Sequence, residues 1–139
     1  MQGRMQGNKR RRDALLGWLL AVACLLAGAA PALARGPAVD GPIAVQSLPR
    51  EARATYELIL AGGPFPFAKD GITFGNYENM LPRQRRGYYH EFTVRTPGAH
   101  NRGARRIVCG AEARDWARNR PEACYYSDNH YVSFRQIRN

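Results

Sequence analysis

Gly87-Tyr88-Tyr89-His90-Glu91-Phe92-Thr93-Val94 is the stretch of this sequence that decides the fold. It is aromatic and β-branched and has no proline and no interior glycine, which favours an extended strand in the middle of a sheet. Because side chains alternate between the two faces of a strand, one face is expected to carry Tyr89, Glu91 and Thr93, and the other Tyr88, His90, Phe92 and Val94. The first face is polar, and the second has the character of core.

Glu91 is unusual in such a strand, since glutamate disfavours strands and is rarely buried without a partner. Arginines that can pair with it follow at Arg102, Arg105 and Arg106, and a histidine comes later at His130. Phosphodiester cleavage without a metal needs a base, phosphate clamps and an acid, and these residue types supply all three. We interpret them as a candidate active site; the alternative is that Glu91 is only an ion-paired residue of the sheet.

The N-terminus has the pattern of a secretory signal over residues 1–34, with basic residues at 9–12, an apolar run over 14–30 and a small-x-small cleavage site at the end. The apolar run is shorter than the roughly 20 residues of a spanning helix. We therefore expect cleavage, secretion and no membrane attachment of the mature protein. Residues 35–47 contain glycine and proline without periodicity and are expected to form a flexible leader, which leaves 48–139 as the folded domain.

The charge and the cysteine content limit which partners the mature chain can have. Removal of residues 1–34 takes away five basic residues and one acidic residue, so the net charge falls from +10 to +6. Nearly all remaining basic residues are arginine, which suits phosphate contacts and favours an RNA partner over the alternative of a merely solvated basic surface. Cys109 and Cys124 remain after Cys24 is removed, and an oxidising compartment is expected to pair them. Two thiols are too few for a zinc site, so no metal or cofactor is expected.

The rest of the chain predicts one helix followed by strands. The helix opens near Pro49, carries its apolar stripe on Ala52, Tyr56, Ile59 and Leu60, and ends at Gly62-Gly63. Strands are expected at 72–74, 88–94, 105–109, 123–126 and 131–137. This order predicts the α+β class, with one N-terminal helix packed on a twisted antiparallel sheet.

Short motifs spread over almost the whole domain carry a family resemblance. They are Gly63-Pro64-Phe65-Pro66-Phe67, Asp70-Gly71, Phe74-Gly75-Asn76-Tyr77-Glu78, Leu81-Pro82, Gly87-Tyr88-Tyr89-His90-Glu91, Thr96-Pro97-Gly98-Ala99, Arg102-Gly103 and Arg105-Arg106-Ile107. In order and spacing the chain from about Leu48 to Phe134 resembles the microbial guanyl-specific ribonucleases, most closely the secreted streptomycete enzymes and more distantly barnase. The chain departs from the streptomycete pattern in two ways: it lacks the cysteines that tie the chain ends together, and it has an insertion over 110–123.

The resemblance implies a role for each residue of the candidate active site. It implies the microbial ribonuclease fold, with Glu91 as general base, His130 as general acid, and Arg102 and Arg106 as phosphate-binding arginines. His90 is the competing histidine, but as the neighbour of Glu91 in a strand it must face the other way and is expected to be packed or hydrogen-bonded. Arg105 and Arg106 are neighbours in a strand, so only one of them can share a face with Glu91, and the family places Arg106 there.

The resemblance also implies a guanine-reading loop. The substrate-binding residues are then Phe74, Gly75, Asn76, Tyr77 and Glu78, with backbone N–H groups meeting the guanine O6 and the Glu78 carboxylate accepting the N1 and N2 protons. Tyr77 is expected to cover the base, as the tyrosine of fungal relatives does, and Tyr131 to bond the phosphate, although a strand tyrosine is more often only packing.

These inferences converge on a secreted, monomeric endoribonuclease. We expect it to cleave single-stranded RNA 3′ of guanosine through a guanosine 2′,3′-cyclic phosphate. One alternative is a non-catalytic basic RNA-binding module, which would be expected to have lost Glu91 or His130. Another is an antibacterial ribonuclease toxin whose producer keeps a barstar-like protein inhibitor.

Overall fold

The structure is a computed structural model and describes residues 39–139. The predicted signal over 1–34 and the first residues of the predicted leader, 35–38, lie outside the described residues, so cleavage stays a prediction. Within residues 39–139, no helix has the length and apolar character that a membrane span needs.

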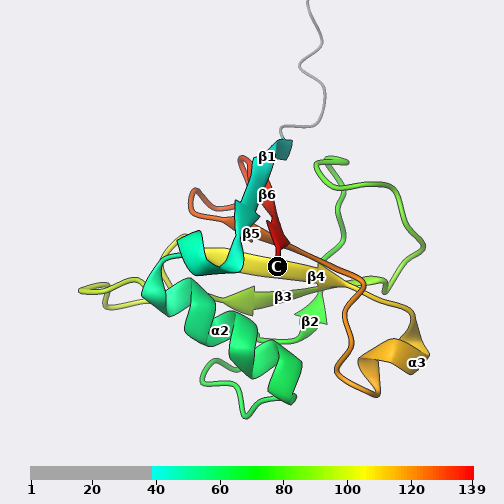
Figure 1. Cartoon of the computed structure of the whole chain (residues 1–139), viewed down its shortest axis with the longest axis horizontal. Helices are drawn as coiled ribbons and strands as arrows, with labels where there is room; N and C mark the ends of the chain where they lie inside the picture. The colour runs from blue at the N-terminus through cyan, green and yellow to red at the C-terminus, as the bar shows by residue number, and fades with distance from the viewer. Residues whose placement is uncertain (1–38) are drawn as a thin grey trace, which may run out of the picture. The chain divides into compact units, whose positions relative to one another are not determined.

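A six-stranded sheet forms the body of the fold, and the long helix crosses one of its faces (Figure 1). In chain order the elements are β1 (Val39–Ala44), the short 3-10 helix η1 (Val45–Ser47), α2 (Arg50–Ala61), β2 (Ile72–Thr73), β3 (Tyr89–Thr93), β4 (Arg106–Gly110), α3 (Ala113–Trp116), β5 (Ala123–Ser127) and β6 (Phe134–Arg138). The strand order is β1-β6-β5-β4-β3-β2, and every neighbouring pair is antiparallel except β1 and β6. The predicted α+β class is confirmed.

Helix α2 packs on the sheet through a stripe that differs by one position from the predicted one. Ala52 and Ile59 are buried as expected, but Leu60 is 46% exposed. Thr55 takes the place on the stripe between Ala52 and Ile59, and its hydroxyl donates to the Thr93 carbonyl of β3 at 3.2 Å. The helix ends at Gly62, whose φ of 82° is the left-handed conformation typical of a glycine cap.

Both faces of the sheet are packed, although the sequence predicted one core face. The helix-side core includes Phe92, Val94 and Ile107, and the opposite face carries an aromatic cluster around Tyr89 and Phe134. Tyr88, expected beside Phe92, packs in the aromatic cluster instead. The reason is that β3 begins only at Tyr89, so Tyr88 still belongs to the preceding turn and does not follow the strand alternation.

The expectation of a flexible leader is wrong for residues 39–47. Val39–Ala44 forms β1, which pairs in parallel with β6, and Ile43 is only 6% exposed. The Arg135 side chain of β6 donates to the carbonyls of Gly41 and Pro42 at 3.1 Å each. Pro42 suggested a loop, but an edge strand tolerates proline because a missing N–H on its outer side breaks no ladder bond.

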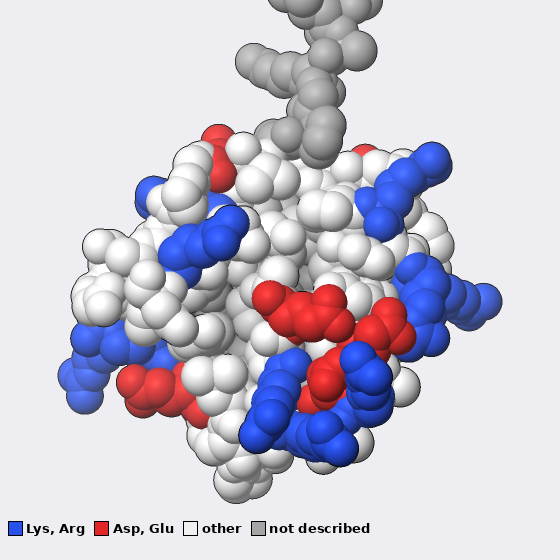
Figure 2. Space-filling view, turned by 45° about the vertical axis from the view of Figure 1, so that its right-hand side comes forward, with Lys and Arg blue, Asp and Glu red and all other residues white. Residues whose placement is uncertain are grey.

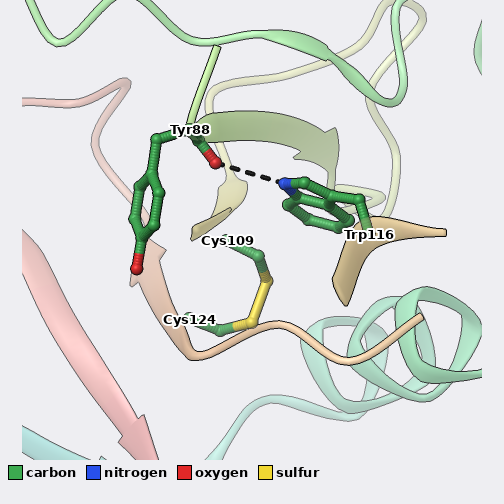
Figure 3. The surroundings of a disulfide bond; sticks show 4 residues. All are labelled: Tyr88, Cys109, Trp116 and Cys124. Carbon is green, nitrogen blue, oxygen red and sulfur yellow. Dashed lines mark hydrogen bonds between the residues drawn. A yellow bond between two sulfur atoms is a disulfide. The ribbon is translucent and has the colours of Figure 1, made fainter. Parts of the chain in front are cut away.

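The predicted disulfide joins directly opposed residues of β4 and β5, Cys109 and Cys124. Between them the insertion forms α3, a helix that the sequence did not predict. Its Trp116 side chain lies over the disulfide and donates from the indole nitrogen to the Tyr88 carbonyl at 3.2 Å (Figure 3). The insertion thus covers the end of the sheet next to the start of β3.

Because β1 is part of the core, we expect Ile43→Ala to destabilise the protein. Removing a buried isoleucine side chain to alanine costs about 2–5 kcal/mol. The matched control is Val39→Ala in the same strand, where the side chain is 41% exposed and the expected loss is below about 0.5 kcal/mol. Urea unfolding of both variants measures the difference; equal stabilities would show that β1 does not contribute to the folded core.

Candidate active site

Glu91 lies in the middle of β3 on the face opposite α2, and its side chain is 12% exposed. Each carboxylate oxygen has its own partner. Arg102 donates from Nη2 to Oε1 at 3.2 Å, and the Tyr131 hydroxyl donates to Oε2 at 2.8 Å. A carboxylate with so little contact with water is stabilised by such partners, because an unpaired charge in a largely buried position is unfavourable.

Arg102 comes from the loop between β3 and β4 and is aimed by a second contact. Its Nε donates to the Thr93 hydroxyl at 2.9 Å. Thr93 lies two residues after Glu91, so both side chains project from the same face of β3. The strand therefore holds both the carboxylate and the group that orients the guanidinium.

Arg106 is the buried arginine of the site, only 3% exposed. Its Nε donates to the Tyr131 hydroxyl at 3.1 Å, and its Nη1 donates to the carbonyl of Gly103 at 2.9 Å. Nη2 donates no hydrogen bond to any residue in 39–139, so it is available to a ligand. Arg105 projects to the other side and pairs with Glu51 of α2 at 3.9 Å, as the alternation along β4 predicts.

His130 and Tyr131 sit in the turn between β5 and β6, and both have left-handed backbones, with φ of 57° and 69°. Such a conformation costs non-glycine residues about 1–3 kcal/mol and persists where the surroundings impose it. Here the Tyr131 amide donates to the Ser127 hydroxyl at 3.0 Å, and the His130 amide donates to the Ala104 carbonyl at 3.1 Å. The His130 side chain is exposed at the tip.

Tyr131 links the acidic and basic parts of the site, because its hydroxyl donates to Glu91 and accepts from Arg106. Burial, the hydrogen bond to Glu91 and the charge of Glu91 together raise the pKa of Tyr131 to about 12, against a smaller opposite effect of Arg106. Of these two partners, Glu91 lines the cleft described below and Arg106 does not.

A cleft of about 550 Å³ brings most of the predicted site residues together. It is lined by residues of β3 and the β5–β6 turn and by the loop over 74–78: Thr73, Phe74, Gly75, Asn76, Tyr77, Glu78, Met80, Glu91, His130, Tyr131 and Val132. Arg102 and Arg106 are not part of this lining, but each is hydrogen-bonded to a residue that is: Arg102 to Glu91 and Arg106 to Tyr131. The predicted acid and base thus share one cavity.

The loop over 74–78 lines the cleft and is held by hydrogen bonds and ring stacking. Asn76, with φ of 48°, closes the loop from inside: its side chain accepts from the Leu81 amide at 3.0 Å and donates to the Leu81 carbonyl at 2.9 Å. The Phe74 ring stacks on Tyr131 with centroids 5.2 Å apart. Across the described part of the chain, the amides of residues 75–78 donate no hydrogen bond and are free for a ligand.

Two side chains of this loop are exposed to solvent at the cleft. Glu78 is exposed. Tyr77 is 91% exposed, and its ring lies so close over Gly75 that a Cβ there would come within 2.3 Å of it. The absence of a side chain at Gly75 is therefore what lets the tyrosine ring lie along the loop.

His90 is not part of the cleft, as the alternation predicts. Its Nδ1 is 2.8 Å from the Gly71 carbonyl and its Nε2 is 3.1 Å from the Gly87 carbonyl, while its ring packs against Trp116 of the insertion. Both ring nitrogens are occupied on the side of β3 away from Glu91. This histidine is a structural residue.

Sequence reasoning missed several residues of the site. Thr93, which orients Arg102, was detectable because the strand alternation already placed it beside Glu91. Met80 and Val132 line the cleft without any sequence pattern that marks them. Ser127 holds the Tyr131 backbone through a turn contact that only the folded hairpin creates.

A family model described as ribonuclease matches residues 36–138 of the chain. The chain belongs to the ribonuclease family. Guanyl-specific ribonuclease Sa of Kitasatospora aureofaciens is 44% identical to this ribonuclease over 99 residues, which cover 71% of the chain and 95% of the relative. Guanyl-specific ribonuclease Sa3 of the same organism is 45% identical over 97 residues, 70% of the chain, but the chain spans only 63% of the length of that relative.

Solved structures agree with the sequence matches. A structure of ribonuclease Sa2 in complex with mononucleotides superposes on this ribonuclease with a TM-score of 0.64 at 39% identity, covering 75% of the chain and 98% of Sa2. A structure of Sa2 with guanosine-2′-cyclophosphate gives a TM-score of 0.61, with coverages of 71% and 97%. The family and the fold that the sequence motifs suggested are confirmed.

We expect the pKa of Tyr131 to fall in Glu91→Gln. The neutral amide no longer disfavours the phenolate, so the value moves from about 12 toward the ordinary 10, but burial keeps it above 10. The ring carbon shift of Tyr131, followed by NMR as pH is raised, reports this value. Glu112→Gln, which removes a carboxylate elsewhere, should leave it unchanged; an unchanged value in Glu91→Gln would contradict the contact.

Proposed function

We propose that this protein is a guanyl-specific endoribonuclease that cleaves single-stranded RNA 3′ of guanosine. The observation that carries the proposal is one cleft lined by a partnered carboxylate, Glu91, by the imidazole of His130 and by a loop with free backbone amides. The guanyl-specific relatives, at 44% and 45% identity, support the choice of base.

In the first chemical step we assign Glu91 as the general base. It removes the proton from the ribose 2′-OH, and the 2′ oxygen forms a bond to phosphorus while the bond from phosphorus to the 5′ oxygen breaks. His130, as imidazolium, gives its proton to the departing 5′ oxygen. Attack in line with the leaving group requires base and acid on opposite sides of the phosphate, which suits groups from a central strand and from a separate hairpin.

The arginines are assigned to the charge that develops on the phosphate. Arg106 has its free Nη2 behind Tyr131, and Arg102 is held against Glu91, so both guanidiniums are oriented before the substrate enters. Donors fixed in advance stabilise a transition state without reorganising.

The product of this first step is a guanosine 2′,3′-cyclic phosphate. In the second step water opens the cyclic phosphate, with the roles of Glu91 and His130 exchanged.

Guanine recognition is assigned to the loop over 74–78. Its free amides are donors for O6, and the exposed Glu78 carboxylate is the acceptor for the N1 and N2 protons. Only guanine offers this donor pair beside an acceptor, and another base would leave protein groups unpaired. The Tyr77 ring is positioned at the rim to stack on the base, which is worth about 1–3 kcal/mol.

The cellular setting follows from the same proposal. The signal-like N-terminus and the disulfide between Cys109 and Cys124 both favour export to an oxidising compartment. We propose a secreted, monomeric enzyme whose basic surface suits an acidic protein inhibitor of the barstar kind.

End-mapping of the products from a defined RNA tests the substrate assignment. Wild-type protein should cut after guanosine and leave cyclic phosphate ends, with unchanged rate in EDTA because side chains supply acid, base and clamps. Glu78→Gln should lose about 10²-fold or more of its preference for guanosine, since the amide cannot accept both protons. Cuts after all four bases by wild-type protein, or loss of activity in EDTA, would overturn the proposal.

Replacing either proton-transfer group should nearly abolish cleavage without unfolding the protein. Glu91→Gln and His130→Ala are each expected to lower kcat by about 10²–10⁴-fold. The matched controls are Glu57→Gln on the exposed side of α2 and His100→Ala on an exposed loop, and both should keep wild-type rates. Circular dichroism checks the fold, and normal activity in either cleft variant would reject the mechanism.

A further inference from the structure

A second groove borders the loop over 74–78, next to the cleft of the candidate active site. Its volume is about 720 Å³, and it is lined by Thr73, Phe74, Gly75, Asn76, Tyr77, Asn79, Arg83, Gln84, Arg85, Arg86, Gly87 and Tyr89. We call it the arginine groove. Residues 73–77 belong to both linings, so the loop is a wall between the two cavities.

The groove concentrates positive charge at one place on a mixed surface. On the face that carries the β2–β3 loop and α3, basic side chains form several separate groups, and acidic side chains lie among them in the lower half of the view (Figure 2). The lining of the arginine groove, in contrast, includes three arginines and no acidic residue. A local site of this kind favours an anionic ligand.

Two of the three arginines, Arg83 and Arg86, form no ion pair within residues 39–139. Arg85 forms an ion pair with Glu112, the residue that immediately precedes α3. Arg83 only donates from Nε to the amide oxygen of Asn79 at 3.1 Å, a neutral contact that orients its outer nitrogens. Arg86 makes no ion pair within residues 39–139. Free guanidiniums in a groove suit phosphate oxygens, which they bind in bidentate fashion.

The groove and the active-site cleft follow one strand. Tyr89 lines the groove and Glu91 lines the cleft, and both project from the same face of β3. Two residues along a strand are about 7 Å apart, which is within the reach of one nucleotide step. The exposed Tyr77 side chain belongs to the lining of both cavities.

We propose that the arginine groove is an RNA subsite for the nucleotide next to the cleaved guanosine, with Arg83 and Arg86 on its phosphate. The proposal rests on the proposed function, which places guanosine in the neighbouring cleft. The groove binds backbone and adds affinity for longer RNA, whereas the loop selects the base. A phosphate contact of this kind positions the strand and carries no sequence information.

Binding of uncleavable RNA tests the subsite without requiring turnover. The probes are a seven-nucleotide RNA whose single guanosine lacks the 2′-OH, placed in the middle, and guanosine 3′-monophosphate, which has no neighbouring nucleotide. Shifting the guanosine to either end of the longer probe shows which neighbour uses the groove. The variants are Arg83→Ala/Arg86→Ala and, as a charge-matched control, Arg50→Ala/Arg138→Ala, whose side chains are exposed and line neither cavity.

The groove variant should bind the seven-nucleotide RNA at least about 10-fold more weakly, since each missing guanidinium would otherwise donate charged hydrogen bonds to phosphate. The slope of log Kd against log salt should fall by about 0.7, the value for the one phosphate that the variant no longer neutralises. Guanosine 3′-monophosphate should bind the groove variant as tightly as wild-type protein, because it has no neighbouring nucleotide to enter the groove. The control variant should show neither the weaker affinity nor the change of slope.

An unchanged affinity and slope in the groove variant would overturn the subsite. An equal loss of affinity in the control, or an equal loss with guanosine 3′-monophosphate, would do the same, because it would show a general effect of net charge or damage to the cleft. Failure of wild-type protein to cut ordinary RNA after guanosine would instead refute the proposed function. The binding readout and the cleavage readout therefore separate the two claims.

Discussion

The partnering of one buried carboxylate governs the arrangement of this molecule. Glu91 lies in the middle of a strand with a side chain that is 12% exposed, where an ionised carboxylate without partners is not tolerated. Its partners come from distant parts of the chain, Arg102 eleven residues later and Tyr131 forty residues later. Each partner is fixed in turn, Arg102 by Thr93 and Tyr131 by Arg106, so the loop and the hairpin are both tied to β3 through the charge.

This constraint explains why both faces of a small sheet are packed. Helix α2 covers one face and gives the main core, while the aromatic cluster on the other face supports the site. Phe74 and Phe134 both contact the Tyr131 ring and hold the hairpin residue whose backbone is left-handed. The strain of the hairpin is therefore offset by packing on the same face that carries the carboxylate.

Features with a short-range cause were predictable from the sequence, and those with a long-range cause were not. Strand alternation placed Glu91 beside Thr93 and separated Arg105 from Arg106, because the period of a strand is local. The parallel pairing of β1 with β6 joins the two ends of the domain, and nothing near Gly41 and Pro42 reveals it. The family motifs located the cleft residues, but only the fold shows that Thr93 orients Arg102.

The loop over 74–78 shows how the fold divides recognition between backbone and side chains. The side-chain amide of Asn76 is hydrogen-bonded to the backbone of Leu81. This side chain therefore holds the loop and is not available to read a base. The backbone amides of residues 75–78 donate no hydrogen bond within residues 39–139, and donors fixed in place discriminate by leaving wrong partners unsatisfied. In the arrangement that we propose, selectivity resides in this short loop and the arginines beside it supply affinity for the strand as a whole. Because phosphates are the same in every sequence, those arginines can vary without changing which base is read.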